Sequence, residues 1–422
     1  MGADRRPGSV AIVGSGPAGC YTAQALRRLR PDAKITVIER LPVPYGLVRY
    51  GIAADHQGTK NVTKQFDRLF ERDAVGFAGN VAVGRDVTLE TLRELFDAVV
   101  IATGLPADRV LGLPGESLVG VHGSGAFTRY LNGYPDQALD ACDPGTDVVV
   151  IGAGNVAIDV VRLLAGRAED RRGSDLHPDT EAATLTGGIE RITLLARSAQ
   201  AEVRCAAAMI NELGRIGGLR FEVTGQTCTQ GSAAARAIAE LPGCHTDDHR
   251  LTVELRFGAA PLGFVGDDRV AGVRVADVDG GVVVIPATAV ITAIGFAAGS
   301  GSDPVGVDRP PGVFTAGWAH FGPRGALPDA RADGRRVAAE IDAHLASETG
   351  PDRGGLAALR DVLPFTPVDF ERWRRIDRAE ISAADSDRAR RKFLTAGELL
   401  AAATDPTLDD ATAIVPTERP PA

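Results

Sequence analysis

Long apolar runs are missing from this chain of 422 residues. It contains no stretch of 18 or more uncharged apolar residues, so the sequence predicts no membrane-spanning helix. The first eight residues carry charged side chains and no apolar core of a signal peptide. We therefore expect a cytoplasmic protein. Hydrophobic residues make up 44% of the chain and charged residues 24%, proportions typical of a globular protein in solution.

Cysteine is also scarce, and its spacing excludes several chemistries. No two of the five cysteines are spaced Cys-x-x-Cys. This argues against an iron–sulfur cluster, a zinc ribbon and a redox-active disulfide. We expect isolated, reduced thiols and no metal site. The cysteines are Cys20, Cys142, Cys205, Cys228 and Cys244.

Positive charge is in deficit, because the formal net charge is −9. An acidic chain is a poor non-specific binder of nucleic acid, and we predict no nucleic-acid partner. The sequence shows neither a His-x-x-x-His pair nor a Gly-x-Ser-x-Gly elbow, which leaves no candidate for hydrolytic chemistry. Because 422 residues exceed one compact core, two domains are expected.

What the chain does contain is glycine, with 50 residues, arranged twice in the same short pattern. Residues 10–19 read as an apolar strand followed by Gly-Ser-Gly-Pro-Ala-Gly, and residues 148–157 as a second strand followed by Gly-Ala-Gly-Asn-Val-Ala. Each pattern opens a helical stretch. The first glycine allows a tight bend, the second lets the backbone approach a pyrophosphate, and the third position must be small. The motif residues are Gly14, Gly16, Pro17, Ala18, Gly19, Gly152, Gly154, Asn155, Val156 and Ala157.

The residues that follow each second strand favour different nucleotides. Glu39 ends the strand at 35–38, 20 residues past Gly19, where an acid accepts hydrogen bonds from the ribose hydroxyls of an adenosine. The corresponding strand at 192–195 ends in Arg197 and Ser198, which suit a 2′-phosphate. We therefore expect FAD in the first fold and NADP(H) in the second. Solvated surface positions remain the alternative for Glu39 and Arg197, and weak discrimination against NADH stays open.

Further strands indicate how the two folds are connected. Buried runs that end in glycine occur at 96–104 and at 288–295, and another strand follows at 313–318. The second fold is thus expected to be inserted into the first. The fold class is α/β, with two Rossmann-like dinucleotide-binding domains and the NADP domain inserted into a discontinuous FAD domain. We predict an FAD domain over 1–106 and 297–405, an NADP(H) domain over 107–296, and a flexible tail over 406–422.

Within the second domain, period-two patterning at 251–257, 270–275 and 282–285 predicts an antiparallel meander. The segments 165–188 and 226–249 lack periodicity and are expected to be long loops.

The proline- and glycine-rich segment at 41–56 is apolar and aromatic, unlike a surface loop. It is a candidate cover for a flat ring system, and a loop packed on the core is the alternative.

With these residues in place, the chain resembles the adrenodoxin-reductase-like family of ferredoxin–NADP reductases. The match is carried by the two glycine motifs, by residues 42–62 and 79–84, and by Gly317-Trp318 with residues 322–325. It extends in order and spacing from about residue 9 to 400. The family implies an FAD-dependent reductase that takes hydride from NADPH and passes single electrons to a ferredoxin-like carrier. It also implies a monomer.

The resemblance assigns roles to matching positions. It implies FAD contacts from the first motif and its neighbours, a flavin lining near Trp318, and polar side chains near the redox site. The FAD positions are Ala18, Glu39, Gly46, Leu47 and Val83, and the flavin-lining positions are Trp318, Gly325, Ala326 and Leu327. The NADP positions are Gly154, Asn155, Val156 and Arg197, and the candidate catalytic residues are His56, Asp159 and Glu212.

The chain departs from the family at the NADP site. The family has a second arginine where this chain has Ser198, and an acid where it has Met209. A flavoprotein electron-input subunit of a larger oxidoreductase, as in glutamate synthase, is a second reading. A degenerate FAD-binding sensor or assembly protein is a third. The basic runs at 372–375 and 388–392 are candidate docking patches for an acidic carrier.

Overall fold

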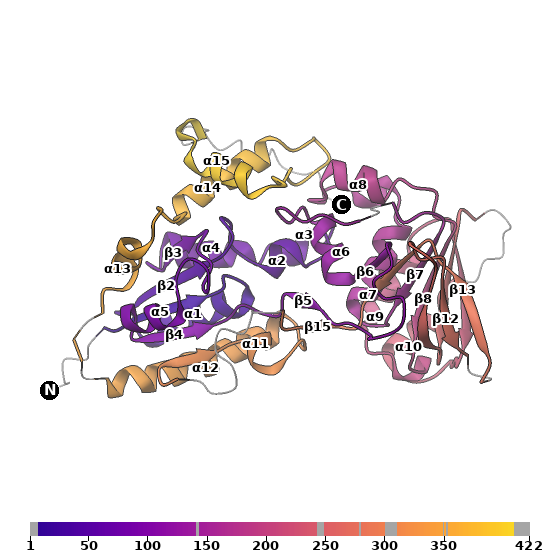
Figure 1. Ribbon diagram of the computed structural model, residues 1–422, viewed down its shortest axis with the longest axis horizontal. Helices are drawn as coiled ribbons and strands as arrows, with labels where there is room; N and C mark the ends of the chain where they lie inside the picture. Colours follow the sequence, from indigo (N-terminus) through magenta and orange to yellow (C-terminus); the bar gives the residue numbers. More distant parts are fainter. Residues whose placement is uncertain are drawn as a thin grey trace. The chain divides into compact units, whose positions relative to one another are not determined.

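The computed structural model describes residues 7–140, 143–242, 249–277, 280–299, 310–348, 350–351 and 353–408 (Figure 1). They divide into two compact units. Unit 1 takes its described residues from 1–49, 58–105 and 300–422, and unit 2 takes them from 50–57 and 106–299. The short segment 50–57 therefore groups with unit 2, although the sequence analysis assigned it to the first domain.

Unit 1 is built on a parallel sheet of five strands in the order β16-β4-β1-β2-β3. On one face, Ala11 and Val13 of β1 belong to a core that includes Leu92 of α5 and Leu359 of α13. On the other face, Ile12 lies against Gly19 of α1, and α12 packs along α1 (Figure 1). The strands are β1 Ser9–Val13, β2 Lys34–Glu39, β3 Gly76–Gly79, β4 Ala98–Ile101 and β16 Val313–Thr315.

Fully buried side chains on both faces of β1 explain why its apolar run is continuous rather than alternating. The helices of this unit, with the segments at its border, are α1 Pro17–Leu29, α2 Leu47–Tyr50, α3 Gln57–Lys60, α4 Thr63–Glu71, α5 Leu89–Leu95, α11 Trp318–Phe321, α12 Leu327–Ser347, α13 Gly355–Val362, α14 Phe370–Ser382 and α15 Ala396–Thr404, with a 3-10 turn at Pro406–Leu408.

Unit 2 repeats the plan with a parallel sheet of six strands in the order β6-β14-β7-β8-β10-β9. A second, antiparallel sheet of three strands, β11-β12-β13, adjoins it, and β5 pairs with β15. The strands are β5 Ala107–Asp108, β6 Val121–Gly123, β7 Asp147–Ile151, β8 Arg191–Ala196, β9 Leu219–Gly225, β10 Leu251–Phe257, β11 Ala260–Val265, β12 Gly272–Ala276, β13 Val282–Pro286, β14 Ala289–Thr292 and β15 Phe296–Ala297.

The helices of unit 2 begin with α6 and include the one that follows the second glycine motif. They are α6 Ser124–Leu131, α7 Asn155–Ala165, α8 Pro178–Thr184, α9 Ala207–Gly214 and α10 Ala233–Ala239, with 3-10 turns at Ala168–Arg171 and Gln200–Glu202. The α/β class with two Rossmann-like folds is confirmed by the two parallel sheets, and the sequence numbering shows the second fold inserted into the first.

Three details of the sequence analysis were wrong. The segment 251–257 is not part of a meander, because β10 pairs in parallel with β8 and β9. Five of its seven residues are buried, so the alternating pattern did not indicate a strand with one face exposed to solvent. The antiparallel sheet instead begins at Ala260. The segments 165–188 and 226–249 contain α8 and α10, short helices stabilised by caps from His177 and Ser232 rather than by a long amphipathic pattern.

Some of the expectations concern residues that lie outside the described ranges. Cys142, Cys244 and residues 409–422 lie outside them. Cys20, Cys205 and Cys228 are free thiols. Within the described part of the chain no helix is long and apolar enough to cross a bilayer. The same part holds no group of three or more His, Cys, Asp or Glu side chains suited to a metal ion.

Candidate functional site: two dinucleotide cradles and a charged cluster

The first glycine turn joins β1 to α1 in unit 1 and leaves room at its centre. Gly14 has φ +108°, and a Cβ there would lie 2.4 Å from the carbonyl oxygen of Ala102. A Cβ at Gly19 would lie 2.0 Å from the oxygen of Gly14. At Gly16, by contrast, a Cβ would meet nothing within 4 Å. Gly14 and Gly19 are thus required by the fold. Gly16, by contrast, keeps open the space before a helix N-terminus where a pyrophosphate fits.

Glu39 faces this turn with a buried carboxylate. Its Oε2 accepts hydrogen bonds from the backbone N–H of Ser15, at 3.0 Å, and from the Ser15 hydroxyl, at 2.6 Å. Its Oε1 accepts from the N–H of Leu41 at 3.2 Å. The side chain is 8% exposed, so it is not the solvated surface glutamate that was the alternative. The acid therefore lies where a ribose would approach the turn.

Other predicted FAD residues surround the same turn. A Cβ at Gly46 would lie 3.2 Å from the Cα of Gly16, so the apolar 41–50 segment packs directly on the cradle. A Cβ at Gly317 would lie 2.5 Å from that of Ala18. Leu47 begins α2, and Val83 packs at the edge of the core of unit 1. Gly46 and Gly317 thus both lie against the start of α1.

The segment after Gly317 is ordered by its own hydrogen bonds. Trp318 is held by its indole Nε1, which donates to the carbonyl of Arg324 at 2.9 Å. Gly325, with φ +77°, precedes Ala326, whose N–H donates to the carboxylate of Asp329 at 2.7 Å. Leu327 then begins α12. Pro328 and Asp329 therefore lie in the first turn of α12, where both residues favour the start of a helix.

The second glycine turn, between β7 and α7 in unit 2, has the same geometry. Gly152 has φ +129°, and a Cβ there would lie 2.3 Å from the oxygen of Ala293. A Cβ at Gly154 would meet nothing within 4 Å. Ala157, at the third position, is fully buried. An alanine is accommodated where the first fold needs glycine, so the departure from the motif leaves the cradle intact.

The predicted 2′-phosphate residues follow β8. Arg197 is exposed, and its side chain forms no recorded ion pair with any described residue. Ser198 accepts a hydrogen bond at its carbonyl from the N–H of Gly258 at 3.0 Å. Asn155 does not point into open space, because its Oδ1 accepts from the N–H of Ala206 at 2.8 Å, and Val156 follows it in the first turn of α7. Met209 packs at the edge of the core of unit 2.

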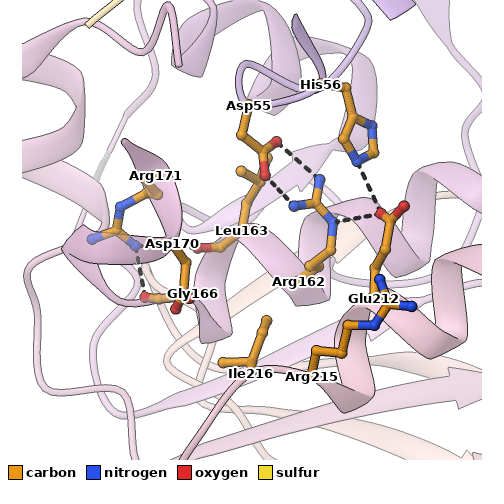
Figure 2. A pocket seen from close by; sticks show the side chains of 10 residues that line it. All are labelled: Asp55, His56, Arg162, Leu163, Gly166, Asp170, Arg171, Glu212, Arg215 and Ile216. Atoms are coloured by element: carbon orange, nitrogen blue, oxygen red, sulfur yellow. Dashed lines mark hydrogen bonds and ion pairs between the residues drawn. The ribbon is translucent and has the colours of Figure 1, made fainter. Parts of the chain in front are cut away.

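The three candidate catalytic residues, far apart in the sequence, come together in unit 2. Figure 2 shows two of them, His56 and Glu212. The Nε2 atom of His56 lies 3.1 Å from the Glu212 carboxylate, and its Nδ1 lies 3.7 Å from the Asp159 carboxylate. Asp159 is on α7 and Glu212 on α9. An imidazole between two carboxylates can hold a proton on either ring nitrogen.

Sequence reasoning missed the two residues that tie this cluster together. Arg162, one turn beyond Asp159 on α7, forms a two-pronged ion pair with Asp55. Its Nη2 lies 2.9 Å from Asp159, and its Nε lies 3.9 Å from Glu212. An Asp-x-x-Arg spacing on one helix and an acid directly before His56 were the available signals.

Burial and the arginine set the ionisation of these carboxylates. Burial raises the pKa of Asp55, but the hydrogen bonds and charge of Arg162 outweigh it, so the net pKa is lowered. For Asp159, burial dominates over Arg162 and His56 and leaves the pKa raised. Burial works against the Arg162 cation, yet its partners Asp55 and Asp159 hold its pKa above the ordinary value. The cluster thus carries a permanent cation among carboxylates of unequal acidity.

A pocket of about 280 Å³ opens beside this cluster within unit 2. Figure 2 shows Arg162, Glu212 and His56 on one side of it and Arg171 on the other. The lining residues are Asp55, His56, Arg162, Leu163, Gly166, Asp170, Arg171, Glu212, Arg215 and Ile216. The cluster therefore lies at the edge of a recess that is open to solvent.

Two residues of the basic runs considered as docking patches form bonds inside unit 1. Arg390 lies 2.7 Å from Asp377 and 3.2 Å from Glu380. Lys392 is 1% exposed and donates to the carbonyl of Arg49. These two side chains are therefore held inside unit 1, and the docking interpretation of the two runs as a whole stays a prediction.

Two dinucleotide cradles in one chain, one nested in the other, define an oxidoreductase of the flavin and pyridine-nucleotide class. Residues 8–213 match the family described as pyridine nucleotide-disulphide oxidoreductase. Cindoxin reductase from Citrobacter braakii is 38% identical over 91% of this chain and 89% of its own length. The mitochondrial NADPH:adrenodoxin oxidoreductase of Salvelinus fontinalis is 30% identical over 93% and 90%.

A solved structure agrees over the whole length. FprA from Mycobacterium tuberculosis, in complex with NADPH, matches with a TM-score of 0.85 at 26% identity, covering 94% of this chain and all of that one. The chain belongs to the adrenodoxin-reductase-like family of ferredoxin–NADP reductases.

Proposed function

We propose that this protein is an FAD-dependent reductase that accepts a hydride from NADPH and delivers single electrons to a ferredoxin-like carrier. The observation that carries the proposal is the pair of glycine turns whose central positions, Gly16 and Gly154, each leave space for a pyrophosphate. FAD belongs to the first turn, where Glu39 supplies a ribose acceptor. NADPH belongs to the second, where Arg197 supplies a free cation.

The bound flavin would supply the conversion of a two-electron donor into one-electron steps. The chain's own residues do the rest. The helix N-termini of α1 and α7 would neutralise the charge of a bound pyrophosphate. Gly46 packs on Gly16 of the first cradle, and the Trp318 indole is fixed by its hydrogen bond to Arg324. His56 and Glu212 share a hydrogen bond and can hold a proton at Nε2 of the imidazole.

The carrier, the quaternary state and the location complete the proposal. The relatives' names pair them with cindoxin, adrenodoxin and ferredoxin. We assign this chain a partner of the same kind, a small acidic one-electron protein. We also assign it a monomeric state in the cytoplasm. Gel filtration of the FAD-loaded protein tests the monomer, since elution as a dimer would contradict it.

Anaerobic stopped-flow mixing tests the donor. We expect NADPH to bleach the flavin absorbance faster than NADH does, because Arg197 pairs with the 2′-phosphate that only NADPH carries. Faster reduction by NADH would keep the reductase and change its donor. Absence of reduction by either nucleotide would favour the sensor or assembly protein.

A second arm distinguishes a free-standing reductase from a subunit of a larger enzyme. NADPH-dependent reduction of an added ferredoxin by the isolated chain is expected. Rapid flavin reduction without transfer to any ferredoxin tested, adrenodoxin-type and bacterial carriers included, would favour the electron-input subunit.

A further inference from the structure

We propose that Arg162 is a positioning residue of the reductase, which holds the Asp55–His56 segment on unit 2 and sets the distance between His56 and Glu212. The inference rests on the proposed function in that His56 and Glu212 are taken to serve flavin reduction. It assigns a role to a residue that neither glycine motif contains.

The first support is that residues 50–57 are fastened to unit 2 along their length. The Ile52 carbonyl accepts from Asn132 Nδ2 at 3.1 Å, and the Ala54 carbonyl accepts from the N–H of Asp175 at 3.0 Å. Ala53 and Ala54 are 3% and 0% exposed in the core of unit 2. These contacts hold the segment up to residue 54, and the two-pronged bond of Arg162 to Asp55 holds the residue next to His56.

The second support is the double link between α7 and α9. At the start of α7, Asn155 bonds the N–H of Ala206, just before α9. Two turns later, Arg162 bonds Asp55 and Asp159 and approaches Glu212. Figure 2 shows its position between Asp55 and Glu212. A helix rises about 1.5 Å per residue, so roughly 10 Å of rigid α7 separates the dinucleotide turn from the cluster. Helix α7 thereby fixes the positions of both the dinucleotide turn and the His56–Glu212 pair.

The third support is the shape of the arginine side chain. The Arg162 side chain is 9% exposed and presents a planar fork to the two oxygens of Asp55 while its edge reaches Asp159. A lysine would keep the charge but could not form both bonds in fixed geometry. Charge and geometry can therefore be separated by substitution.

The test compares Arg162→Lys with the wild-type holoenzyme. Amide hydrogen exchange of the peptide covering 50–57 is expected to rise about tenfold, because the end of the segment beyond Ala54 loses the two-pronged bond that anchors Asp55. In anaerobic stopped-flow mixing, the limiting rate of flavin reduction should fall about tenfold while the Kd for NADPH changes less than about twofold, since only positioning is lost. Asp55→Asn should change the exchange and the limiting rate in the same directions. This variant replaces Arg162→Lys in the test if the lysine variant does not fold.

Arg171→Lys is the matched control. Arg171 is 4% exposed and its Nε donates to Glu181 at 2.8 Å, so this variant also breaks a buried arginine–carboxylate pair in unit 2. It should lower the melting temperature and leave the limiting rate unchanged. Arg162→Lys with wild-type exchange over 50–57, or with a limiting rate no lower than that of Arg171→Lys, overturns the proposal. Failure of the wild type to be reduced by NADPH would instead overturn the proposed function, and the exchange arm would still decide whether Arg162 anchors the segment.

Discussion

Gly16 and Gly19 are three residues apart in the first turn, yet glycine is needed for opposite reasons. Gly16 faces empty space, whereas a Cβ at Gly19 would lie 2.0 Å from the oxygen of Gly14. Motif spacing alone does not reveal this difference, because it emerges only when α1 packs on β1.

The two glycines should therefore respond differently to alanine. Gly16→Ala is expected to fold with a melting temperature close to that of the wild-type apoprotein but to purify with little FAD, because the new methyl group occupies the pyrophosphate space. Gly19→Ala should lose about 2 kcal/mol of stability through overpacking. Flavin absorbance and thermal unfolding measure both. A yellow, fully loaded Gly16→Ala protein would contradict the assignment of the cradle.

Asp55 and Asp159 both contact Arg162 but contribute to stability with opposite sign. The folded-state pKa of Asp55 is lowered, so its contribution is present above the unfolded pKa of about 3.9 and is lost as the pH falls through the folded value. The pKa of Asp159 is raised, so stability is lost as the pH rises above the unfolded pKa, and the loss is complete once the pH exceeds the folded value.

Neutral substitutions test this contrast. At pH 7, Asp55→Asn is expected to lose about 3 kcal/mol, because it breaks a buried two-pronged ion pair. Asp159→Asn should be neutral or slightly stabilising at the same pH. Denaturant unfolding at pH 7 and at about pH 2.5, below the unfolded pKa, is the measurement, and the difference between Asp55→Asn and wild type should shrink at the lower pH. Equal destabilisation by both variants would be inconsistent with the opposite pKa shifts.

At the scale of elements, helix α9 depends on its neighbour for its N-terminus. Its N-cap position, Ala206, has no side chain able to cap the helix, and Asn155 of α7 accepts the hydrogen bond from its N–H instead. The residue expected to touch the nucleotide pyrophosphate is therefore also a structural link between two helices.

Asn155→Ala should lower the stability of the nucleotide-free protein by about 1 kcal/mol, the usual value of a lost cap. Any weakening of NADP(H) binding would come in addition. Thermal unfolding without nucleotide measures the first effect, and titration with NADP⁺ the second. A suitable control is Thr395→Ala, which removes a cap from α15 in unit 1 and should leave NADP⁺ affinity unchanged. An unchanged melting temperature for Asn155→Ala would show that α9 does not need the link.

Element type was predictable where the local pattern was strong and unpredictable where partners decided it. The strands before both glycine turns follow from their apolar runs and from the turn that ends them. The segment 251–257 looked half-buried, but its position between β8 and β9 buries both faces. The short helices α8 and α10 have too few residues to show a helical period and depend on caps and packing.

At the scale of the whole molecule, the second nucleotide fold is inserted into the first along the chain. Unit 1 is assembled from segments that flank unit 2 in sequence, and the chain passes between the units near residues 49, 57, 105 and 299. Each unit has its own sheet and its own core.

Each nucleotide should therefore stabilise its own unit. A ligand at about one hundred times its Kd adds about 2.7 kcal/mol to the state that binds it. FAD is expected to slow amide exchange around 9–39 and 313–327, and NADP⁺ around 148–165 and 191–214. Hydrogen-exchange mass spectrometry of the apoprotein with each ligand alone gives the pattern. Protection of 148–165 by FAD and of 9–39 by NADP⁺ would reverse the assignment of the cradles.

The sequence by itself determined the two dinucleotide folds, their nesting and the acid or arginine after each second strand. Those features are local, since a glycine turn and the strand before it lie within about ten residues. Tertiary structure alone decided that Asp55, His56, Asp159, Arg162 and Glu212 meet, and that Arg390 faces buried acids. The Asp55–Arg162 and His56–Glu212 contacts join residues more than a hundred positions apart. The energies of all these contacts depend on burial and on the orientation of planar groups, which local sequence patterns do not encode.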